Sequence, residues 1–473
     1  MSSDAPQDPP RKSRLIIPGA EADDAPSEKP RLVTSTGDDI EPETPRQASR
    51  IVLPPGVSRE TPEDLPEYPR LRPLMIVPVR DGKRELLVIT DPLGVVQGQP
   101  VLGIEALPLL QLMDGTVSLS DMSAALMRES KDIRVSNMVR DFVAQLDELL
   151  LLDSPRYQTA LRAMQEAYHP LEIRPAALAD RAYPADPTEL RVMLDAHFAE
   201  AEGWRAAANE PASAADARPR AVMTPHLDPR RSGPAIARAV SEIGSGSGPL
   251  RVVVIGTGHQ LVDDMFALTR KHFETPLGKV TCDTAFVDKV AARIGETAYR
   301  SELAHRDEHS IEFVVLYLKH RLGERPFTIV PILAGGFHTL LDDGKMPRED
   351  AAFEALITAV RDTERELGGA TVYVGPVDFS HIGPRFGDAK IDEKAKTEIE
   401  RIDRAAIEPA LKGDADAWFA AIATHGDATR ICGFAPVYAL LRCAEPGAGR
   451  LLRYEQSDEP DTSMVSVAAA VWP

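Results

Sequence analysis

Short apolar runs alternate with longer amphipathic segments from about residue 220 to the C-terminus. Four runs have the length and apolar content of buried strands: 221–223, 251–255, 327–333 and 371–374. Apolar positions at helical spacing predict four helices among them: 233–243, 283–294, 309–322 and 350–367. This alternation predicts an α/β fold for residues 220–473, with a mostly parallel sheet that carries helices on both faces.

A different pattern occupies residues 69–157. Apolar residues at 75–79 and 85–90 flank the pair Asp81-Gly82, which suits a tight turn and predicts a β-hairpin. Ser118 with Asp121 three positions later predicts a helix start, and apolar residues at helical spacing over 135–150 predict a further helix. These elements predict a small α+β module that resembles a winged helix.

The two remaining segments differ from both patterns. Residues 158–219 predict a helical connection, within which Asp186-Pro187 marks a helix start. Residues 1–68 are rich in proline and in charged residues, which disfavour both helix and sheet. We therefore expect a disordered tail at this end of the chain.

Charge and cysteine content narrow the classes of partner. The chain of 473 residues carries 54 basic and 73 acidic side chains, a net charge of -19. Phosphate backbones and anionic lipid surfaces repel so acidic a chain, which argues against nucleic acid and membranes as partners. Only three cysteines, and a beginning without an apolar leader, predict a cytoplasmic protein.

Reactive side chains follow three of the predicted strands. His226 follows the first strand, His259 follows the second, and Asp378 and His381 follow the strand at 371–374. Because the carboxyl ends of parallel strands lie at one edge of a sheet, we expect these four side chains to converge there. Cys432 stands apart from them, just before an apolar segment that predicts a helix.

These side chains suit a transition metal. Neutral imidazoles with a thiolate bind iron, copper or zinc, whereas two imidazoles with a carboxylate form the iron site of non-haem oxygenases. We expect a metal at His226 and His259, with either Cys432 or Asp378 as the third ligand. Asp378 and His381 predict an acid/base pair if their segment turns helically, and the alternative is that Asp378 caps the next helix.

Further residues are candidates for the surroundings of the metal or the substrate: His309, Glu312, Arg230 and Asp228. His309 and Glu312 fall on one face of the helix predicted over 309–322. Two roles stay open for the start of that helix. Asp307 would cap the helix, or a side chain of this segment would donate a hydrogen bond to, or accept one from, a metal ligand. Arg230 is a candidate for holding an anionic substrate.

Six motifs occur in an order that is typical of one protein family: Asp180 to Leu190, Pro225-His226 with Ser232-Gly233-Pro234, Gly256 to His259, Asp307 to Glu312, Asp378 to His381 and Ile431-Cys432-Gly433. In these motifs residues 173–473 resemble the Memo family, also called AmmeMemoRadiSam system protein B. The resemblance implies a fold like that of the class III extradiol dioxygenases, which are non-haem iron enzymes. It implies a metal at His226, His259 and Cys432, with Asp378 and His381 beside it. It also implies a radical S-adenosylmethionine protein and an AMMECR-type protein as partners.

Two positions depart from the pattern of that family. Leu227-Asp228-Pro229 follow the first histidine, where small residues and an aromatic are usual. Pro376-Val377 precede the aspartate, where small hydroxyl residues are common. Asp228 would either add a ligand to the site or alter the pocket for its usual substrate.

The N-terminal module carries a second resemblance. Residues 109–116 and the leucine-rich segment that ends at Leu152-Asp153 are similar to the PqqD-like family, small winged-helix modules that capture peptides along a strand edge. DNA binding is disfavoured because the third helix presents more acidic than basic side chains: Arg140 against Asp141, Asp147 and Glu148. The resemblance therefore implies a peptide ligand for this module.

Two functions are consistent with these residues. The first is a non-haem oxidoreductase that uses iron or copper, acts with the radical S-adenosylmethionine and AMMECR-type partners, and takes a peptide from the N-terminal module. The alternative is a scaffold protein that binds a peptide or sequesters copper without turnover. We favour the enzyme because ionisable groups gathered in one cleft are typical of reactive sites.

Overall fold

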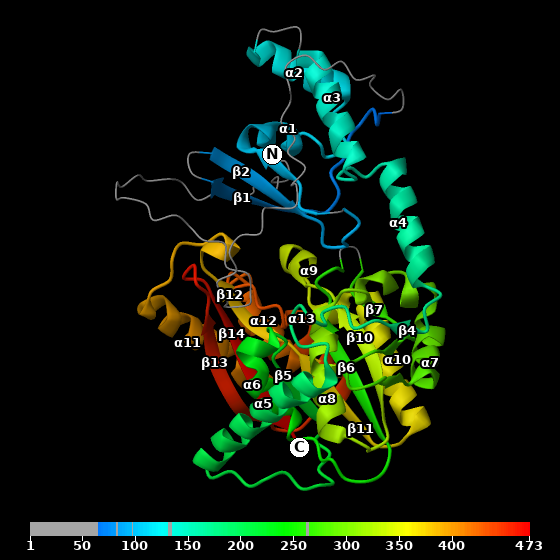
Figure 1. Ribbon diagram of the computed structural model, residues 1–473, viewed down its shortest axis with the longest axis vertical. Coiled ribbons are helices and arrows are strands. Elements are labelled where there is room, and N and C mark those ends of the chain that lie inside the picture. The colour runs from blue at the N-terminus through cyan, green and yellow to red at the C-terminus, as the bar shows by residue number, and fades with distance from the viewer. Residues whose placement is uncertain (1–64, 82–83, 97, 131–134, 262–263) are drawn as a thin grey trace, which may run out of the picture. The chain divides into compact units, whose positions relative to one another are not determined.

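The computed structural model describes residues 65–473 apart from 82–83, 97, 131–134 and 262–263 (Figure 1). The tail predicted over 1–68 therefore lies, up to residue 64, outside the described residues. Three groups of buried apolar side chains organise the rest of the chain. One group lies within residues 87–152, and the other two lie within 182–472.

A three-stranded antiparallel sheet forms the N-terminal module. The predicted hairpin is confirmed, because β1 pairs antiparallel with β2 from Met75 opposite Thr90 to Asp81 opposite Arg84. The predicted helix start is confirmed as well, since the Asp121 backbone N–H donates to Ser118 Oγ at 3.1 Å. The module contains β1 (Met75–Asp81), β2 (Arg84–Thr90), β3 (Val101–Gly103), α1 (Leu107–Gln111), α2 (Leu119–Ser130) and α3 (Val135–Glu148). Its likeness to a winged helix stays a prediction.

The segment predicted as a helical connection contains two long helices and a short strand. Asp186 caps the second helix by accepting hydrogen bonds from the backbone N–H groups of Thr188 and Glu189, at 2.8 and 2.9 Å. Pro187 follows at the first helical position, where its missing N–H is harmless. The elements are α4 (Pro155–Tyr168), β4 (Ile173–Arg174) and α5 (Pro187–Ala207).

Within the described residues, nine strands form the main sheet. All four predicted strands are confirmed, and they lie side by side and parallel at its centre: β5 (Ala221–Thr224), β11 (Thr371–Pro376), β6 (Leu250–Thr257) and β10 (Phe327–Ala334). The prediction of a mostly parallel sheet is wrong at the edges, where the pairings are mainly antiparallel. A short turn joins the last two strands of the chain, and such turns make antiparallel pairs. The other strands are β7 (Phe266–Leu268), β9 (Thr281–Cys282), β12 (Asp378–Ile382), β13 (Arg450–Asp458) and β14 (Met464–Trp472), while β8 (His272–Phe273) pairs with β4.

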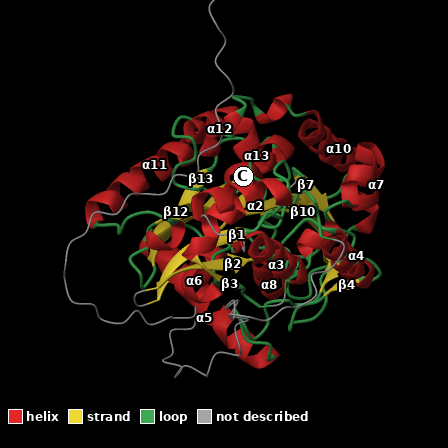
Figure 2. Ribbon diagram, turned by 90° about the horizontal axis from the view of Figure 1, so that it is seen from above, coloured by secondary structure: helices red, strands yellow, loops and turns green. Residues whose placement is uncertain are grey.

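Helices cover both faces of this sheet, as predicted (Figure 2). Alternate side chains of β6 show why: Val252 and Val254 join one buried group, whereas Val253 and Ile255 join the other. The first face is covered by α5, α6 (Pro229–Val240) and α8 (His309–Leu322). The second is covered by α7 (Thr284–Ile294), α10 (Ala351–Leu367), α12 (Ala415–Ala423) and α13 (Phe434–Ala444), with α11 (Glu393–Leu411) beside them. A short helix, α9 (His338–Asp342), follows β10.

The parallel centre brings the ends of β5, β6 and β11 to one edge of the sheet. In the described ranges, no helix has both the length and the hydropathy needed to cross a bilayer.

Candidate metal centre

His226 lies just beyond the end of β5 and is 1% exposed. Its backbone N–H donates to Asp378 Oδ1 at 3.0 Å, and its Nδ1 lies 2.8 Å from the Pro376 carbonyl oxygen. A carbonyl can only accept, so Nδ1 carries the proton of the neutral ring and Nε2 keeps its lone pair. Burial lowers the pKa of His226, which the Asp378 carboxylate partly offsets. The ring is therefore neutral at pH 7, as a metal ligand must be.

Cys432 lies against that free nitrogen. Its Sγ is 3.3 Å from His226 Nε2, accepts from the Asp378 backbone N–H at 3.3 Å, and lies 3.4 Å from the Asp378 carbonyl oxygen. Burial, followed by the negative charge of Asp378, raises the pKa of this thiol well above its ordinary value. A bound cation would instead lower the pKa of the thiol, because a nearby positive charge favours the thiolate.

His259 follows β6 and is fixed by the first turn of α8. Its Nδ1 lies 3.0 Å from Glu308 Oε1, and its backbone N–H donates to Glu308 Oε2 at 3.0 Å. Glu308 is buried and also caps α8, where it accepts from the Ser310 backbone N–H at 2.9 Å. Burial lowers the pKa of His259, but the adjacent Glu308 carboxylate outweighs it and the net shift is upward.

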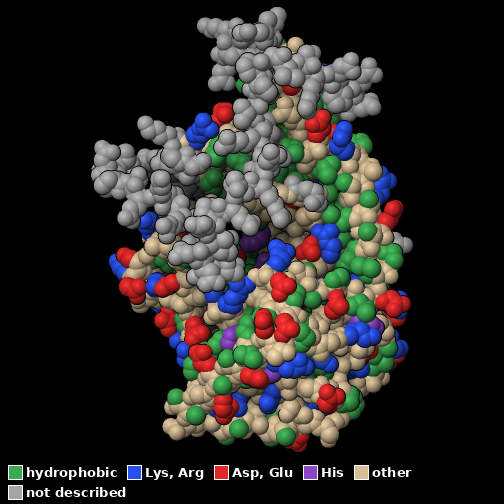
Figure 3. All heavy atoms as spheres, viewed as in Figure 1, with side chains coloured by type: hydrophobic (Ala, Val, Ile, Leu, Met, Phe, Trp, Pro, Cys, Tyr) green, Lys and Arg blue, Asp and Glu red, His purple; other side chains and the backbone are tan. Residues whose placement is uncertain are grey.

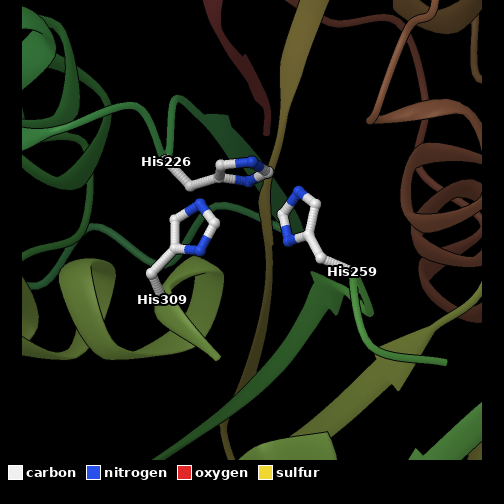
Figure 4. Close-up of side chains that lie close together, drawn as sticks. All are labelled: His226, His259 and His309. Carbon is white, nitrogen blue, oxygen red and sulfur yellow. The ribbon is translucent and has the colours of Figure 1, made fainter. Parts of the chain in front are cut away.

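His309, the first residue of α8, completes a cluster of three imidazoles (Figure 4). Its ring centroid lies 5.1 Å from that of His226 and 4.6 Å from that of His259, and the centroids of His226 and His259 are 5.2 Å apart. Burial lowers the pKa of His309 to about 3, against an opposing effect of Glu308. Its ring is therefore neutral and able to bind a metal.

Two groups of ligand atoms within 4.8 Å of one another occur among the described residues: His226 with His259 and His309, and His226 with Asp378 and Cys432. His226 belongs to both, so the structure brings all of the predicted metal ligands around one imidazole. His259 and Cys432 do not share a group, and their joint ligation stays a prediction. Sequence reasoning missed His309 as a candidate ligand, although its place next to an acidic helix start was a usable signal.

Asp378 and His381 lie on β12, so the expectation of a helical turn between them is wrong. Asp378 does not cap a helix either; its Oδ1 accepts from the backbone N–H groups of His226 and Leu227, at 3.0 and 3.1 Å. The Nδ1 of His381 lies 2.8 Å from the carbonyl oxygen of Phe379, which leaves its Nε2 free. Burial lowers the pKa of His381 despite the opposing charge of Asp378.

Two predicted neighbours of the site are committed to contacts elsewhere. The Glu312 carboxylate pairs with Arg174 at 2.5 Å and accepts from the Leu178 backbone N–H at 2.9 Å, which anchors α8 to the preceding segment. Arg230 donates through Nε to the Ala182 carbonyl at 3.1 Å.

Two further acidic side chains cap helices. Asp228 accepts from the Arg230 backbone N–H at 2.9 Å and caps α6. Glu308 caps α8, whereas Asp307, the predicted cap, pairs with Arg306 at 2.5 Å.

An α/β sheet whose central strands lead into imidazoles and a carboxylate, with a thiol from a neighbouring turn beside them, defines a class of candidate metalloprotein. Residues 174–471 match the model of the Memo-like protein family, and the chain belongs to that family. The resemblance drawn from the six motifs is thereby confirmed.

The chain is also similar to named relatives. A MEMO1 family protein of Aquifex aeolicus is 26% identical over 391 residues, which cover 81% of this chain and 95% of the relative. One from Thermus thermophilus is 27% identical, over 68% of this chain and 89% of the relative. One from Methanopyrus kandleri is 30% identical, over 50% and 78% respectively. The Aquifex match covers too large a share to lie within residues 174–471, so it extends into the N-terminal module.

Proposed function

We propose that this protein is a metal-dependent oxidoreductase whose iron or copper binds at His226, His259 and Cys432, within a fold like that of the class III extradiol dioxygenases. One observation carries the proposal. The Nε2 of His226 is held free by the Pro376 carbonyl, lies 3.3 Å from the Cys432 sulfur, and belongs to a ring packed against those of His259 and His309.

The donor set fits such a metal. Imidazole nitrogen and thiolate sulfur suit iron, copper and zinc, and acceptors on the opposite nitrogen are typical of metal-binding histidines. His226 has the Pro376 carbonyl in that place, and His259 has the Glu308 carboxylate. Iron or copper would supply one-electron chemistry when bound.

Asp378 and His381 are proposed to move protons beside the metal. Burial lowers the pKa of His381, so its ring is neutral at pH 7 and its Nε2 can accept a proton from a substrate. Asp378 holds the backbone of His226 and Leu227 through two hydrogen bonds, which keeps the first imidazole in place.

Metal analysis of protein purified without added metal tests the proposal. We expect about one iron or copper per chain, and a loss of at least 10-fold in metal content in H226A and in C432A. His320, in the last turn of α8, pairs with Asp195, and H320A is the matched control that should retain the metal. A wild-type protein without metal, or H226A with an undiminished content, would contradict the proposal.

Copper sequestration without turnover is the second candidate, and the buried contact between a thiol and an imidazole favours it, because soft sulfur ligands select Cu(I). Oxygen uptake by the metal-loaded protein, with catechols and peptides as substrates, separates the two functions. Uptake that H381A abolishes supports the oxidoreductase. Tight Cu(I) binding with no uptake supports sequestration.

The proposed setting of this activity is the cytoplasm, together with a radical S-adenosylmethionine protein and an AMMECR-type protein. The N-terminal module would supply a peptide as a PqqD-like winged helix, and β1 ends its sheet, where an added strand can pair. Basic and acidic side chains are interspersed over the described part of the face in Figure 3, which supports the absence of a nucleic-acid partner. Co-purification of the three proteins from one strain tests the partnership.

A further inference from the structure

A fully buried carboxylate lies next to β12, outside the cluster of histidines. Asp403, on α11, is 0% exposed. Its Oδ1 accepts from Ser380 Oγ at 2.6 Å, and its Oδ2 accepts from Ser466 Oγ at 2.5 Å and from the Tyr454 hydroxyl at 2.8 Å. Three hydroxyl donors from three strands therefore converge on one carboxylate.

One of these hydroxyls, that of Ser380, lies within an irregularity of β12, and that of Ser466 comes from the paired strand β14. Asp378 lies opposite Val467 of β14 and His381 lies opposite Val465, so three steps along β12 match two steps along β14. This mismatch is a β-bulge, in which one residue is extra. The backbone N–H of Ser380, inside the bulge, donates to the Ser466 side chain at 2.9 Å.

The bulge decides where Asp378 and His381 point. Residues three apart in a regular strand face opposite sides of the sheet. Val465 and Val467 are two apart and share a side, so the residues opposite them, His381 and Asp378, share it too.

The same two residues are fixed along one neighbouring segment. The Gly433 backbone N–H donates to the Asp378 carbonyl at 3.0 Å, and the His381 backbone N–H donates to the Thr429 carbonyl at 2.8 Å. The bulge therefore sets both side chains relative to Cys432, which lies in that segment.

We propose that Asp403 is a positioning residue, which orients the hydroxyls of Ser380 and Ser466 so that the bulge holds Asp378 and His381 on the side of the sheet that bears the histidine cluster. Without the carboxylate, Ser466 loses its acceptor and the bulge loses its anchor to α11. A slip of one residue would then turn His381 to the opposite side. A role of this alignment of Asp378 and His381 in catalysis rests on the proposed function. The positioning of the two side chains by Asp403 does not.

The tautomer of His381 in the metal-free protein is the direct readout. His381 is protonated on Nδ1, which donates to the Phe379 carbonyl inside the bulge and lies 3.1 Å from the Arg430 carbonyl. We would record long-range proton–nitrogen NMR spectra of protein labelled with ¹⁵N-histidine, and assign the His381 signals by their loss in H381Q. In D403A we expect the Nδ1-protonated signals to give way to those of an exchanging ring, and in D403N, which keeps one acceptor oxygen, a smaller change.

A matched control separates this role from general loss of stability. Glu364 is a partly buried carboxylate that accepts from Arg220 and from the Tyr373 hydroxyl, near the start of β11 and away from its carboxyl end. E364Q should leave the His381 signals unchanged. Should D403A fail to fold, S466A removes the acceptor of the Ser380 N–H while leaving Asp403 in place, and should change the same signals. Wild-type His381 signals in folded D403A and S466A would overturn the proposal.

Cobalt binding connects the inference to the metal site. We expect D403A to bind Co(II) about 10-fold more weakly than the wild type, and its sulfur-to-cobalt absorption to shift, while E364Q retains both. If no variant binds Co(II), the proposed function fails, and the NMR result still decides the role of Asp403.

Discussion

The histidines around the candidate metal share one hydrogen-bond arrangement, in which an acceptor occupies Nδ1. The acceptor is the Pro376 carbonyl for His226, the Glu308 carboxylate for His259 and the Phe379 carbonyl for His381. Each ring thereby turns its Nε2 away from this acceptor, and the rings of His226 and His381, whose pKa values are lowered by burial, are neutral at pH 7. The sequence predicted three of the imidazoles but not the nitrogen that each would offer, because the acceptors are set by tertiary contacts that no local spacing encodes.

Protonation of Asp403 links a single residue to the stability of the fold. Burial, against three hydrogen bonds from hydroxyls, raises the pKa of Asp403 to about 6 from an ordinary 3.8. The unfolded chain therefore releases this proton at lower pH than the folded chain, and the stabilisation is lost as pH rises through about 6. Relative to D403N, the wild type should lose about 2 kcal/mol of unfolding free energy between about pH 4.5 and pH 7.5.

Urea unfolding of both proteins across that pH range measures the difference. E364Q, examined in the same way, shows whether the trend belongs to Asp403. A constant difference in unfolding free energy between the wild type and D403N would mean that Asp403 is ionised throughout.

At the scale of the elements, the predicted strands and helices account for the convergence of most candidate ligands. Residues just beyond β5 and β6 do meet at one edge of the sheet, and α8 begins where its pattern predicted. Two features escaped prediction. The bulge in β12 depends on hydroxyl and carboxylate partners on other elements, and the choice of Glu308 over Asp307 as the cap depends on His259, whose position only the fold determines.

Glu308 joins the start of α8 to His259, and its two roles are separable. E308A removes the cap of α8 and the partner of the His259 backbone N–H, and should lower the unfolding free energy by about 2 kcal/mol. E308Q keeps one acceptor oxygen and should lose less. Both variants should lower the pKa of His259 below its ordinary value, because burial then acts without the carboxylate.

Histidine NMR titration and thermal unfolding check these two effects. Asp350 caps α10 by accepting from the Phe353 backbone N–H at 2.8 Å, so D350A is the matched cap variant. D350A should lower the unfolding free energy by a similar amount and leave the pKa of His259 unchanged. An unchanged pKa of His259 in E308Q would show that Glu308 acts on the helix alone.

On the scale of the whole molecule, the three buried groups divide the chain. The N-terminal group ends at Leu152, and the two groups of the main sheet begin at Ala182 and at Ala221, so the N-terminal group shares no buried side chain with them. The boundary near residue 157, which the sequence pattern predicted for the N-terminal module, stays a prediction. The antiparallel edges were not foreseen, because the sequence pattern predicted only the four central strands and none of the edge strands.

Separate cores predict that the part of the chain bearing the site folds alone. A fragment of residues 154–473 keeps Ser154, the cap of α4, and both buried groups of the main sheet. Calorimetry should show two unfolding transitions for the whole chain and one for the fragment. The midpoint of the fragment should lie within a few degrees of the midpoint at which the α/β part unfolds in the whole chain. The fragment should also bind as much Co(II) per chain as the whole protein. An unfolded fragment would show that the N-terminal module completes the fold of the α/β part, and a folded fragment without Co(II) would show that the module contributes to the site.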